Sequence, residues 1–111
     1  MKAQNYLIEN GISLILKKQK YFPEKPGIYR LSDKYGNALY IGKAKNIKAR
    51  TKHYTKLENL SYRHTRMISE TNNIEITITS TEVEALLLES NLIKKLKPKY
   101  NILLKDDKSF P

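Results

Sequence analysis

The fold is decided by one stretch, residues 27–43, which reads GIYRLSDKYGNALYIGK. Two similar tripeptides, Gly27-Ile28-Tyr29 and Tyr40-Ile41-Gly42, lie on either side of a polar segment that contains Gly36 and Asn37. Glycine and asparagine adopt positive φ more readily than other residues, so this segment is typical of a turn. The stretch therefore predicts an antiparallel hairpin with strands at 27–32 and 38–43, on which Tyr29 and Tyr40 are cross-strand or diagonal neighbours.

Helical and extended patterns surround the hairpin. Apolar residues recur near a 3.6-residue period over 4–20, which predicts a helix there, and Asn46 is a suitable N-cap for a second helix over 46–57. A weaker helical pattern covers 60–71. Strict alternation over 74–79 predicts a strand with one apolar face, formed by Ile74, Ile76 and Ile78.

The clearest helical pattern covers residues 82–97. Thr81 and Glu84 have the spacing of a capping box at its start, and Pro98 ends it. Its leucines, isoleucine, valine and alanine supply a broad apolar face. Residues Tyr100 to Leu104 are expected to form a short extended segment that packs back on the core.

Charge is the most informative property of the composition. The 111 residues include 21 Lys and Arg against 11 Asp and Glu, a net charge of +10. A domain this basic is expected to bind nucleic acid. A membrane surface is a poorer fit because the basic segments lack a wide Trp/Phe-rich face. The chain has no cysteine, which excludes disulfides and thiolate metal sites. It also has no apolar run near 20 residues and no secretory signal, so we expect a cytoplasmic protein.

Glu89 occupies an unusual position for an acid. Its same-face neighbours in the predicted helix are apolar, so the carboxylate lies toward or beside the apolar face. A carboxylate there is costly unless it is paired or bound to a cation. Two interpretations remain open. Glu89 is either a boundary residue that reaches solvent or a lysine, or a ligand for Mg²⁺ or Mn²⁺, which take one or two carboxylates with water and phosphate oxygens.

The hairpin and the following helix carry further candidates. Arg50 is either part of a solvated basic face or a phosphate ligand whose planar fork holds two oxygens. Tyr29 and Tyr40 are either packing residues or a general base, which requires a nearby cation to lower the phenol pKa from about 10. Lys43 and a metal on Glu89 are expected to supply that field. His53 and His64 lack the acidic partners of a zinc site.

Taken in order, several of these residues resemble the pattern of GIY-YIG nucleases. The pattern comprises Gly27-Ile28-Tyr29, Tyr40-Ile41-Gly42-Lys43, Arg50, Glu89 and Asn101, and it covers about Pro26 to Asn101. The resemblance implies an α+β fold with a small central three-stranded antiparallel sheet flanked by helices.

Four segments resemble the N-terminal nuclease domain of the UvrC family more closely: YIGKAK at 40–45, EALLLE at 84–89, KPKYN at 97–101 and LKDDKSFP at 104–111. This resemblance implies the 3′-side incision of bacterial nucleotide excision repair, with damaged double-stranded DNA as substrate. It also implies UvrB, with UvrA acting upstream, as partner of the full-length protein. We expect a single domain over 1–111 within a longer chain, comprising a helical segment at 1–25, a catalytic core at 26–104 and the start of a linker at 105–111.

The resemblance implies a role for each candidate. Glu89 would hold one divalent ion, Mg²⁺ or Mn²⁺, and Arg50 would bind the scissile phosphate. Tyr29 or Tyr40 would be the general base, while Lys43 would lower the tyrosine pKa or position water. Tyr54 would contact the phosphate region and Asn101 would orient the site. The predicted DNA contacts are Lys45, Lys48, Lys52 and His53.

Two other functions remain as alternatives. One is a stand-alone repair or homing nuclease of the same fold. The other is a non-catalytic DNA-binding module, which the basic patches alone would support. A pure phosphate binder gains nothing from a half-buried acid, so Glu89 is the residue that discriminates against this second alternative.

Overall fold

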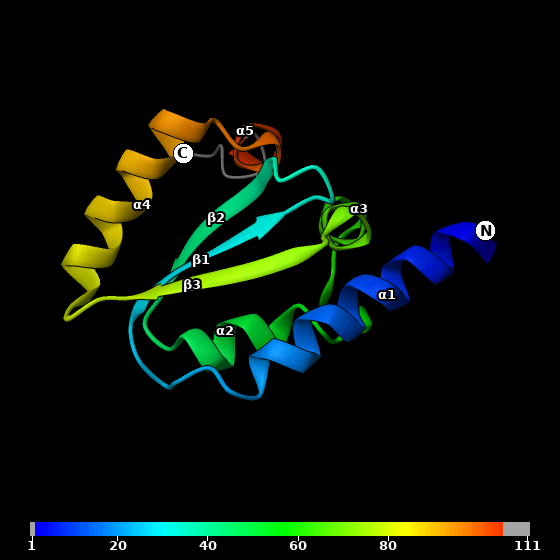
Figure 1. Cartoon of the computed structure of the whole chain (residues 1–111), viewed down its shortest axis with the longest axis horizontal. Helices are drawn as coiled ribbons and strands as arrows, with labels where there is room; N and C mark the ends of the chain where they lie inside the picture. Colours follow the sequence, from blue (N-terminus) through cyan, green and yellow to red (C-terminus); the bar gives the residue numbers. More distant parts are fainter. Residues whose placement is uncertain (1, 106–111) are drawn as a thin grey trace.

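The computed structural model describes the chain from residue 2 to residue 105, and the predicted linker from residue 106, including Asp106 and Asp107, lies outside the described residues. Figure 1 shows the elements in chain order. They are α1 (Lys2–Gln19), β1 (Gly27–Ser32), β2 (Ala38–Ala44), α2 (Ile47–His53), a short 3₁₀ helix (Leu57–Asn59), α3 (Tyr62–Glu70), β3 (Asn73–Ile78), α4 (Glu82–Leu96) and α5 (Lys99–Lys105).

The predicted antiparallel sheet is confirmed. Its strand order is β2-β1-β3, so β2 is an edge strand and β1 lies in the centre. The hairpin register pairs Tyr29 with Gly42 and Leu31 with Tyr40, which makes the two tyrosines diagonal neighbours. The predicted turn is confirmed, and Gly36 supplies its positive φ of 86°, whereas Asn37 has a negative φ.

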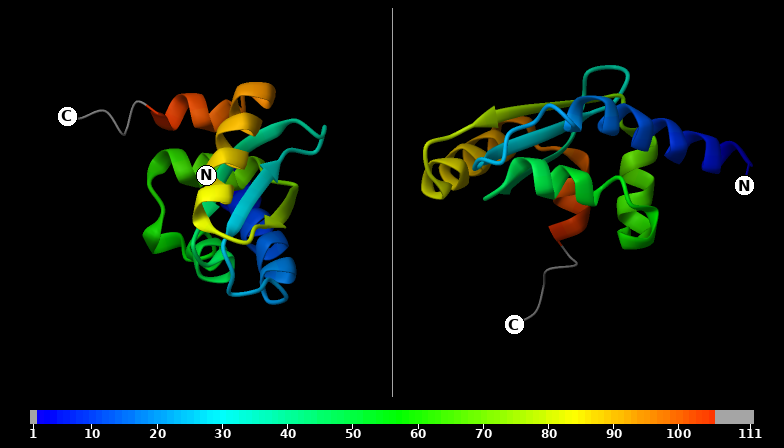
Figure 2. Two further views of the ribbon diagram at one scale, coloured as in Figure 1. Left: turned by 90° about the vertical axis from the view of Figure 1, so that its left-hand side faces the viewer. Right: turned by 90° about the horizontal axis from the view of Figure 1, so that it is seen from below.

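The two faces of the sheet carry cores of different size. Since side chains alternate along a strand, Tyr29 and Leu31 point to one face and Ile28 to the other. The larger core forms on the first face with residues of α1, α2 and α3. The smaller one joins Ile28 and Ile41 to Ala85 of α4. Helix α1 runs alongside, and its N-terminal end projects beyond the sheet (Figures 1 and 2).

Gly11 has a packing role in α1. A glycine lowers helix propensity, which weakens the prediction of a helix at this point. In the structure, a Cβ at Gly11 would overlap the backbone carbonyl of Ile68 in α3. The glycine therefore permits the close approach of α1 and α3.

Two predicted segments differ in the structure. The helix predicted over 46–57 ends at His53, because the Tyr54 N–H bonds to carbonyls of the last turn and the chain turns away. The extended segment predicted for Tyr100 to Leu104 is wrong, since these residues belong to α5. Lys97 takes the left-handed conformation with φ of 46° and reverses the chain, after which a new helix begins beyond Pro98.

Helix α4 is less buried than its sequence predicts. Ala85 is its one buried residue, while Val83 is 66% exposed and Leu87 is 60% exposed. A three-stranded sheet is narrow and covers only part of a broad apolar face. The capping box is also modified: the Thr81 hydroxyl accepts the Glu84 N–H at 3.1 Å, but the Glu84 carboxylate accepts the N–H of Ser80 at 2.7 Å instead of that of Thr81.

Within residues 2–105, no helix is both long and apolar enough to cross a membrane.

Candidate active site

Tyr29 is the centre of a cluster of three tyrosines. Its side chain is 2% exposed, and its hydroxyl shares a hydrogen bond of 2.8 Å with the hydroxyl of Tyr54. The rings of Tyr29 and Tyr40 have their centroids 6.1 Å apart. Gly42, opposite Tyr29, leaves the space for this arrangement, because a Cβ there would overlap the Tyr29 ring and hydroxyl. The paired tripeptides are therefore complementary in packing, with the glycine of one accommodating the tyrosine of the other.

Helix α2 brings two further side chains to this cluster. Asn46 caps it as predicted, with its side-chain oxygen accepting the N–H of Ala49 at 3.0 Å. Ile47 is fully buried and fixes the helix on the core. Tyr54, at the C-terminal end, then points to Tyr29, and Arg50 lies one turn before it.

The phenols of the cluster are protonated at neutral pH. Burial raises the pKa of Tyr29, Tyr40 and Tyr54 above that of a free phenol. Arg50 is the cation that opposes this, since its charge lowers the pKa of all three.

Lys43 lies away from the tyrosines whose pKa it is predicted to lower. It pairs with Ile28 and therefore extends from the face opposite to Tyr29 and Tyr40. The predicted action of Lys43 on the tyrosines stays a prediction, whereas Arg50 is the described side chain whose charge lowers the pKa of all three phenols. Lys43 instead extends on the face that α4 covers.

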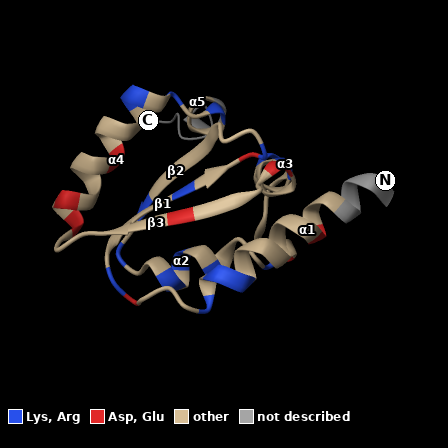
Figure 3. Cartoon of the chain, in the orientation of Figure 1, with Lys and Arg blue, Asp and Glu red and all other residues tan. Residues whose placement is uncertain are grey.

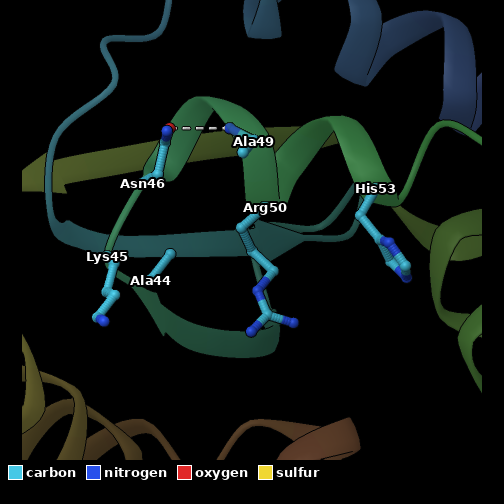
Figure 4. A pocket seen from close by; sticks show the side chains of 6 residues that line it. All are labelled: Ala44, Lys45, Asn46, Ala49, Arg50 and His53. Atoms are coloured by element: carbon cyan, nitrogen blue, oxygen red, sulfur yellow. Dashed lines mark hydrogen bonds between the residues drawn. The ribbon is translucent and has the colours of Figure 1, made fainter.

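A cavity of about 360 Å³ lies beside α2. Figure 4 shows Arg50, His53 and Lys45 pointing to the same side of the helix; the complete lining is Ala44, Lys45, Asn46, Ala49, Arg50 and His53. This collection of cationic and polar groups suits an anionic ligand such as a phosphate.

Only two of the four predicted DNA contacts line this cavity. The Lys48 ammonium group instead donates a hydrogen bond of 3.3 Å to the carbonyl of Lys20. Lys52 follows Lys48 by four residues and shares its face of the helix. Lys45 and His53 are thus grouped with Arg50, and Lys48 and Lys52 lie on another surface.

Glu89 lies half-buried on α4, and its negative charge raises the pKa of Tyr40. Among the described residues, the structure shows neither an ion pair nor a hydrogen bond at its carboxylate. There is also no group of three or more His, Cys, Asp or Glu side chains within the described ranges that could hold a metal ion. A single unpaired carboxylate whose charge reaches Tyr40 fits Mg²⁺, which keeps several waters and takes phosphate oxygens as ligands.

Asn101 acts on the backbone of the second tripeptide. Its side chain accepts the Ile41 N–H at 2.8 Å and donates to the Ile41 carbonyl at 2.9 Å. Because β2 is an edge strand, these two backbone groups have no strand partner on that side. The amide of Asn101 therefore fixes the edge of the sheet next to Tyr40.

Sequence reasoning missed Glu70, which holds α5 in place. Its carboxylate accepts a hydrogen bond from the Tyr100 hydroxyl and lies 3.1 Å from the Lys99 ammonium nitrogen. These contacts hold the two residues that precede Asn101. Glu70 lies on α3, 30 residues from Tyr100, and no spacing in the sequence links the two.

The fold and the site together define a GIY-YIG domain, in which two tyrosines of a hairpin pack with Tyr54 at the end of α2, and Arg50 of α2 and Glu89 of α4 both act on Tyr40. Residues 25–102 match the UvrC-like GIY-YIG domain family. This match covers more than half of the chain, which therefore belongs to that family.

Relatives and solved structures agree with this assignment. The chain is 52% identical over 101 residues to UvrABC system protein C of Bartonella henselae and 54% identical over 101 residues to that of Rhodospirillum rubrum. Each match covers 91% of this chain, which spans 15% and 16%, respectively, of the lengths of those two relatives.

A crystal structure also resembles the fold closely. The N-terminal GIY-YIG endonuclease domain of UvrC from Thermotoga maritima, bound to magnesium as its catalytic cation, superposes with a TM-score of 0.71. It is 40% identical, and the match covers 78% of this chain and 93% of that domain. Variants of that domain with an asparagine or a tyrosine replaced also bind the divalent cation.

Proposed function

We propose that this domain hydrolyses a phosphodiester bond of DNA and, within a longer protein, makes the incision on the 3′ side of a lesion in nucleotide excision repair. One observation carries the proposal. The Tyr40 hydroxyl lies in the field of both Arg50, which lowers its pKa, and Glu89, which raises it. This common influence on Tyr40 supports a site in which Arg50 binds phosphate, Glu89 binds the metal and Tyr40 accepts a proton.

Tyr40 is the better general base of the two candidates. Tyr29 is 2% exposed, so its hydroxyl is reached through Tyr54 and not directly by bulk water. Tyr40 is only partly buried and can contact an attacking water. We assign proton acceptance to Tyr40, whose phenol would be ionised by the combined charge of Arg50 and a divalent ion on Glu89, while Tyr29 and Tyr54 pack beside it.

Arg50 binds the scissile phosphate in this proposal. Its planar fork matches two phosphate oxygens and offsets the charge that develops as the phosphorus becomes pentacoordinate. Lys45 and His53, which line the same cavity, contact the phosphates on either side. Lys43 extends on the opposite face of the hairpin and orients water on the side that α4 covers.

Glu89 is the proposed ligand of one divalent ion, Mg²⁺ or Mn²⁺. Such an ion supplies Lewis acidity at a phosphate oxygen and stabilises the leaving oxygen. The magnesium in the Thermotoga maritima domain supports this assignment, and so does the binding of a divalent cation by variants of that domain in which a tyrosine is replaced by phenylalanine. In such a variant the replaced tyrosine cannot bind the ion through a phenol oxygen. A carboxylate, which is a hard oxygen ligand, therefore remains as the candidate ligand of the ion.

The biological setting follows from the relatives and forms part of the proposal. The substrate is damaged double-stranded DNA, the partners are UvrB and, upstream, UvrA, and the location is the cytoplasm. The relatives are named as components of the UvrABC system, which supports this setting. In the longer chain, residues 1–25 form a helical segment, 26–104 the catalytic core and 105–111 the start of a linker.

Two substitutions test the proposed chemistry. In the complete repair complex with Mg²⁺, Glu89→Gln and Arg50→Ala are each expected to lower 3′ incision by at least a hundredfold, the scale seen when one preorganised charge-stabilising group is removed. Glu75→Gln is the matched control. Glu75 lies on β3 outside the site, and its exposed carboxylate forms an ion pair with Arg30. Wild-type incision by either site variant would refute the assignment.

The same experiment separates the two alternatives. A non-catalytic DNA-binding module would show no incision with any divalent ion and no Mg²⁺ binding that depends on Glu89. A stand-alone nuclease would cut DNA without UvrA and UvrB. Dependence of the incision on both proteins would exclude this second alternative.

A further inference from the structure

The outer face of α2 and the end of α1 carry a second basic surface. It consists of Lys20, Lys48 and Lys52, and we call it the α1–α2 basic surface. Figure 3 shows basic residues gathered on α2 and the C-terminal end of α1, whereas acidic residues mark the first turn of α4. This surface is distinct from the cavity, because Lys48 lies two residues from Arg50 and so points to a different side of the helix.

Specific contacts fix the two elements of this surface relative to one another. Gln19, which is 4% exposed, donates its side-chain amide to the Lys48 carbonyl at 2.7 Å. The Lys48 ammonium group donates back to the Lys20 carbonyl at 3.3 Å. The N–H of Ile47 donates to the carbonyl of Lys25 at 2.9 Å. The lysines therefore have defined relative positions before any ligand binds.

Within the described part of the chain, no acidic side chain forms an ion pair with these lysines. The ion pairs that the structure shows there, Arg30–Glu75 and Lys99–Glu70, lie on other elements. Helix dipoles favour a cation at Lys20, just beyond the end of α1, and at Lys52 in the last turn of α2, but they do not account for Lys48 in the first turn of α2. The positive charge of this surface is thus available to an external anion.

An exposed aromatic ring adjoins these charges. Tyr21 is 78% exposed, and the Lys20 ammonium nitrogen lies 5.2 Å from the centre of its ring. On a duplex such a ring can pack against a sugar of the backbone while the neighbouring cations contact its phosphates.

We propose that the α1–α2 basic surface binds the phosphate backbone of the DNA at a point separate from the scissile phosphate. Helix α2 would then contact DNA through two faces: Arg50, Lys45 and His53 at the bond to be cut, and Lys48 and Lys52 farther along the backbone. This inference rests on the proposal that DNA is the substrate. It adds a second contact that fixes the orientation of the duplex on the domain.

The test is a binding measurement on the full 111-residue chain in EDTA, where cleavage does not occur. The triple variant Lys20→Gln, Lys48→Gln, Lys52→Gln is compared with the wild type by fluorescence anisotropy of a labelled DNA duplex over a range of salt concentrations. The matched control replaces Lys34, Lys94 and Lys95 by glutamine, which removes the same net charge from the hairpin turn and α4. Circular dichroism verifies that both variants are folded.

Each phosphate contact contributes about 0.9 to the slope of log affinity against log salt, so each lost contact lowers the affinity at about 0.1 M salt by roughly eightfold. The triple variant is expected to show a smaller slope and at least a tenfold weaker affinity, and the control to stay within about threefold of the wild type. Equal weakening in both variants would show that net charge alone matters and would overturn the proposal, as would unchanged binding by the triple variant. Failure of the proposed nuclease function would show separately, as absent incision by the wild type with Mg²⁺.

Discussion

Replacing Gly42 by alanine tests whether the paired tripeptides are complementary in packing. A Cβ at this position would overlap the hydroxyl and ring of Tyr29 and approach the ring of Tyr40 at 2.9 Å. Tyr29 is buried on all sides and bonded to Tyr54, so it has little room to move. Alanine at position 42 must therefore displace the ring or the strand.

The expected cost follows from these contacts. Overpacking a buried site costs about 1–3 kcal/mol. Loss of the hydrogen bond between Tyr29 and Tyr54 adds about 1 kcal/mol. A total of about 2–4 kcal/mol lowers the melting temperature of a domain of this size by roughly 10–25 °C. Incision falls as well, because Tyr54 and Arg50 are positioned through the same contact.

Urea unfolding of Gly42→Ala measures this cost, and Gly36→Ala is the matched control. Gly36 also has a constrained backbone, with φ of 86°, but a Cβ there meets no atom within 4 Å. Its substitution costs only backbone strain of about 1 kcal/mol and leaves incision unchanged. A Gly42→Ala variant as stable as Gly36→Ala would refute the packing argument.

A double variant identifies the overlapping group. Tyr29→Phe removes the hydroxyl that the new Cβ would overlap, so Gly42→Ala is expected to cost less in this background than in the wild type. Groups in direct contact show such coupling, whereas independent sites have additive effects. Strictly additive costs would show that Tyr29 is not the residue displaced.

Three further predictions concern the tyrosines and α5. In an alkaline titration followed by tyrosinate absorbance, Tyr29, Tyr40 and Tyr54 are expected to ionise only above the pH of about 10 at which a free phenol titrates, because burial raises their pKa. A phenol whose pKa is higher in the folded than in the unfolded protein contributes stability below pH ~10, and this stability is lost as the pH rises further. Unfolding by urea should therefore become easier above that pH. Ionisation of these three tyrosines at pH ~10 with the fold intact would contradict this. Asn101→Ala is expected to lower the free energy of unfolding, measured in thermal melts, by about 1–3 kcal/mol, because both hydrogen bonds to Ile41 are lost. It is also expected to lower incision without changing the affinity for Mg²⁺. A variant with wild-type stability would show that the edge of β2 does not need the Asn101 amide. Burial and the Glu70 carboxylate raise the pKa of Tyr100 to about 12. Glu70→Gln is therefore expected to lower the pKa of Tyr100, which is measured from the NMR chemical shift of its ring as the pH is raised. An unchanged pKa would show that Glu70 does not contact the hydroxyl in solution.

The parts of the fold that could be predicted from the sequence are those set by local chemistry. The turn between the tripeptides and the alternation over 74–79 are local signals, and the structure has strands at both places. The end of α4 follows from Pro98 in the same way. By contrast, α5 forms because Lys97 takes a left-handed conformation, and no local pattern predicts that conformation for a lysine.

The sequence overestimates the burial of α4, because that burial depends on the width of the sheet and not on the helix. The helix is apolar over a broad face, but β1 and β2 offer only Ile28 and Ile41 to pack against. A helix pattern indicates which face is apolar, and it does not indicate how much of that face finds a partner.

The position of Lys43 was within reach of sequence reasoning. Tyr40 and Lys43 are three residues apart on one strand, and side chains separated by an odd number lie on opposite faces. The spacing along the strand is therefore sufficient to place Lys43 on the face of β2 opposite to Tyr40. The same reasoning on a helix separates Lys48 from Arg50, which are two residues apart.

Arg50 and Glu89 show what spacing along a strand or helix leaves undetermined. Their common influence on Tyr40 depends on how α2 and α4 pack against opposite faces of one narrow sheet. Because β2 is the edge strand, side chains from both faces can reach around it to the same hydroxyl. A wider sheet, or a hairpin placed at its centre, would keep the two charges apart. The edge position of β2, held by Asn101, is thus the structural condition for a site built from residues on both faces.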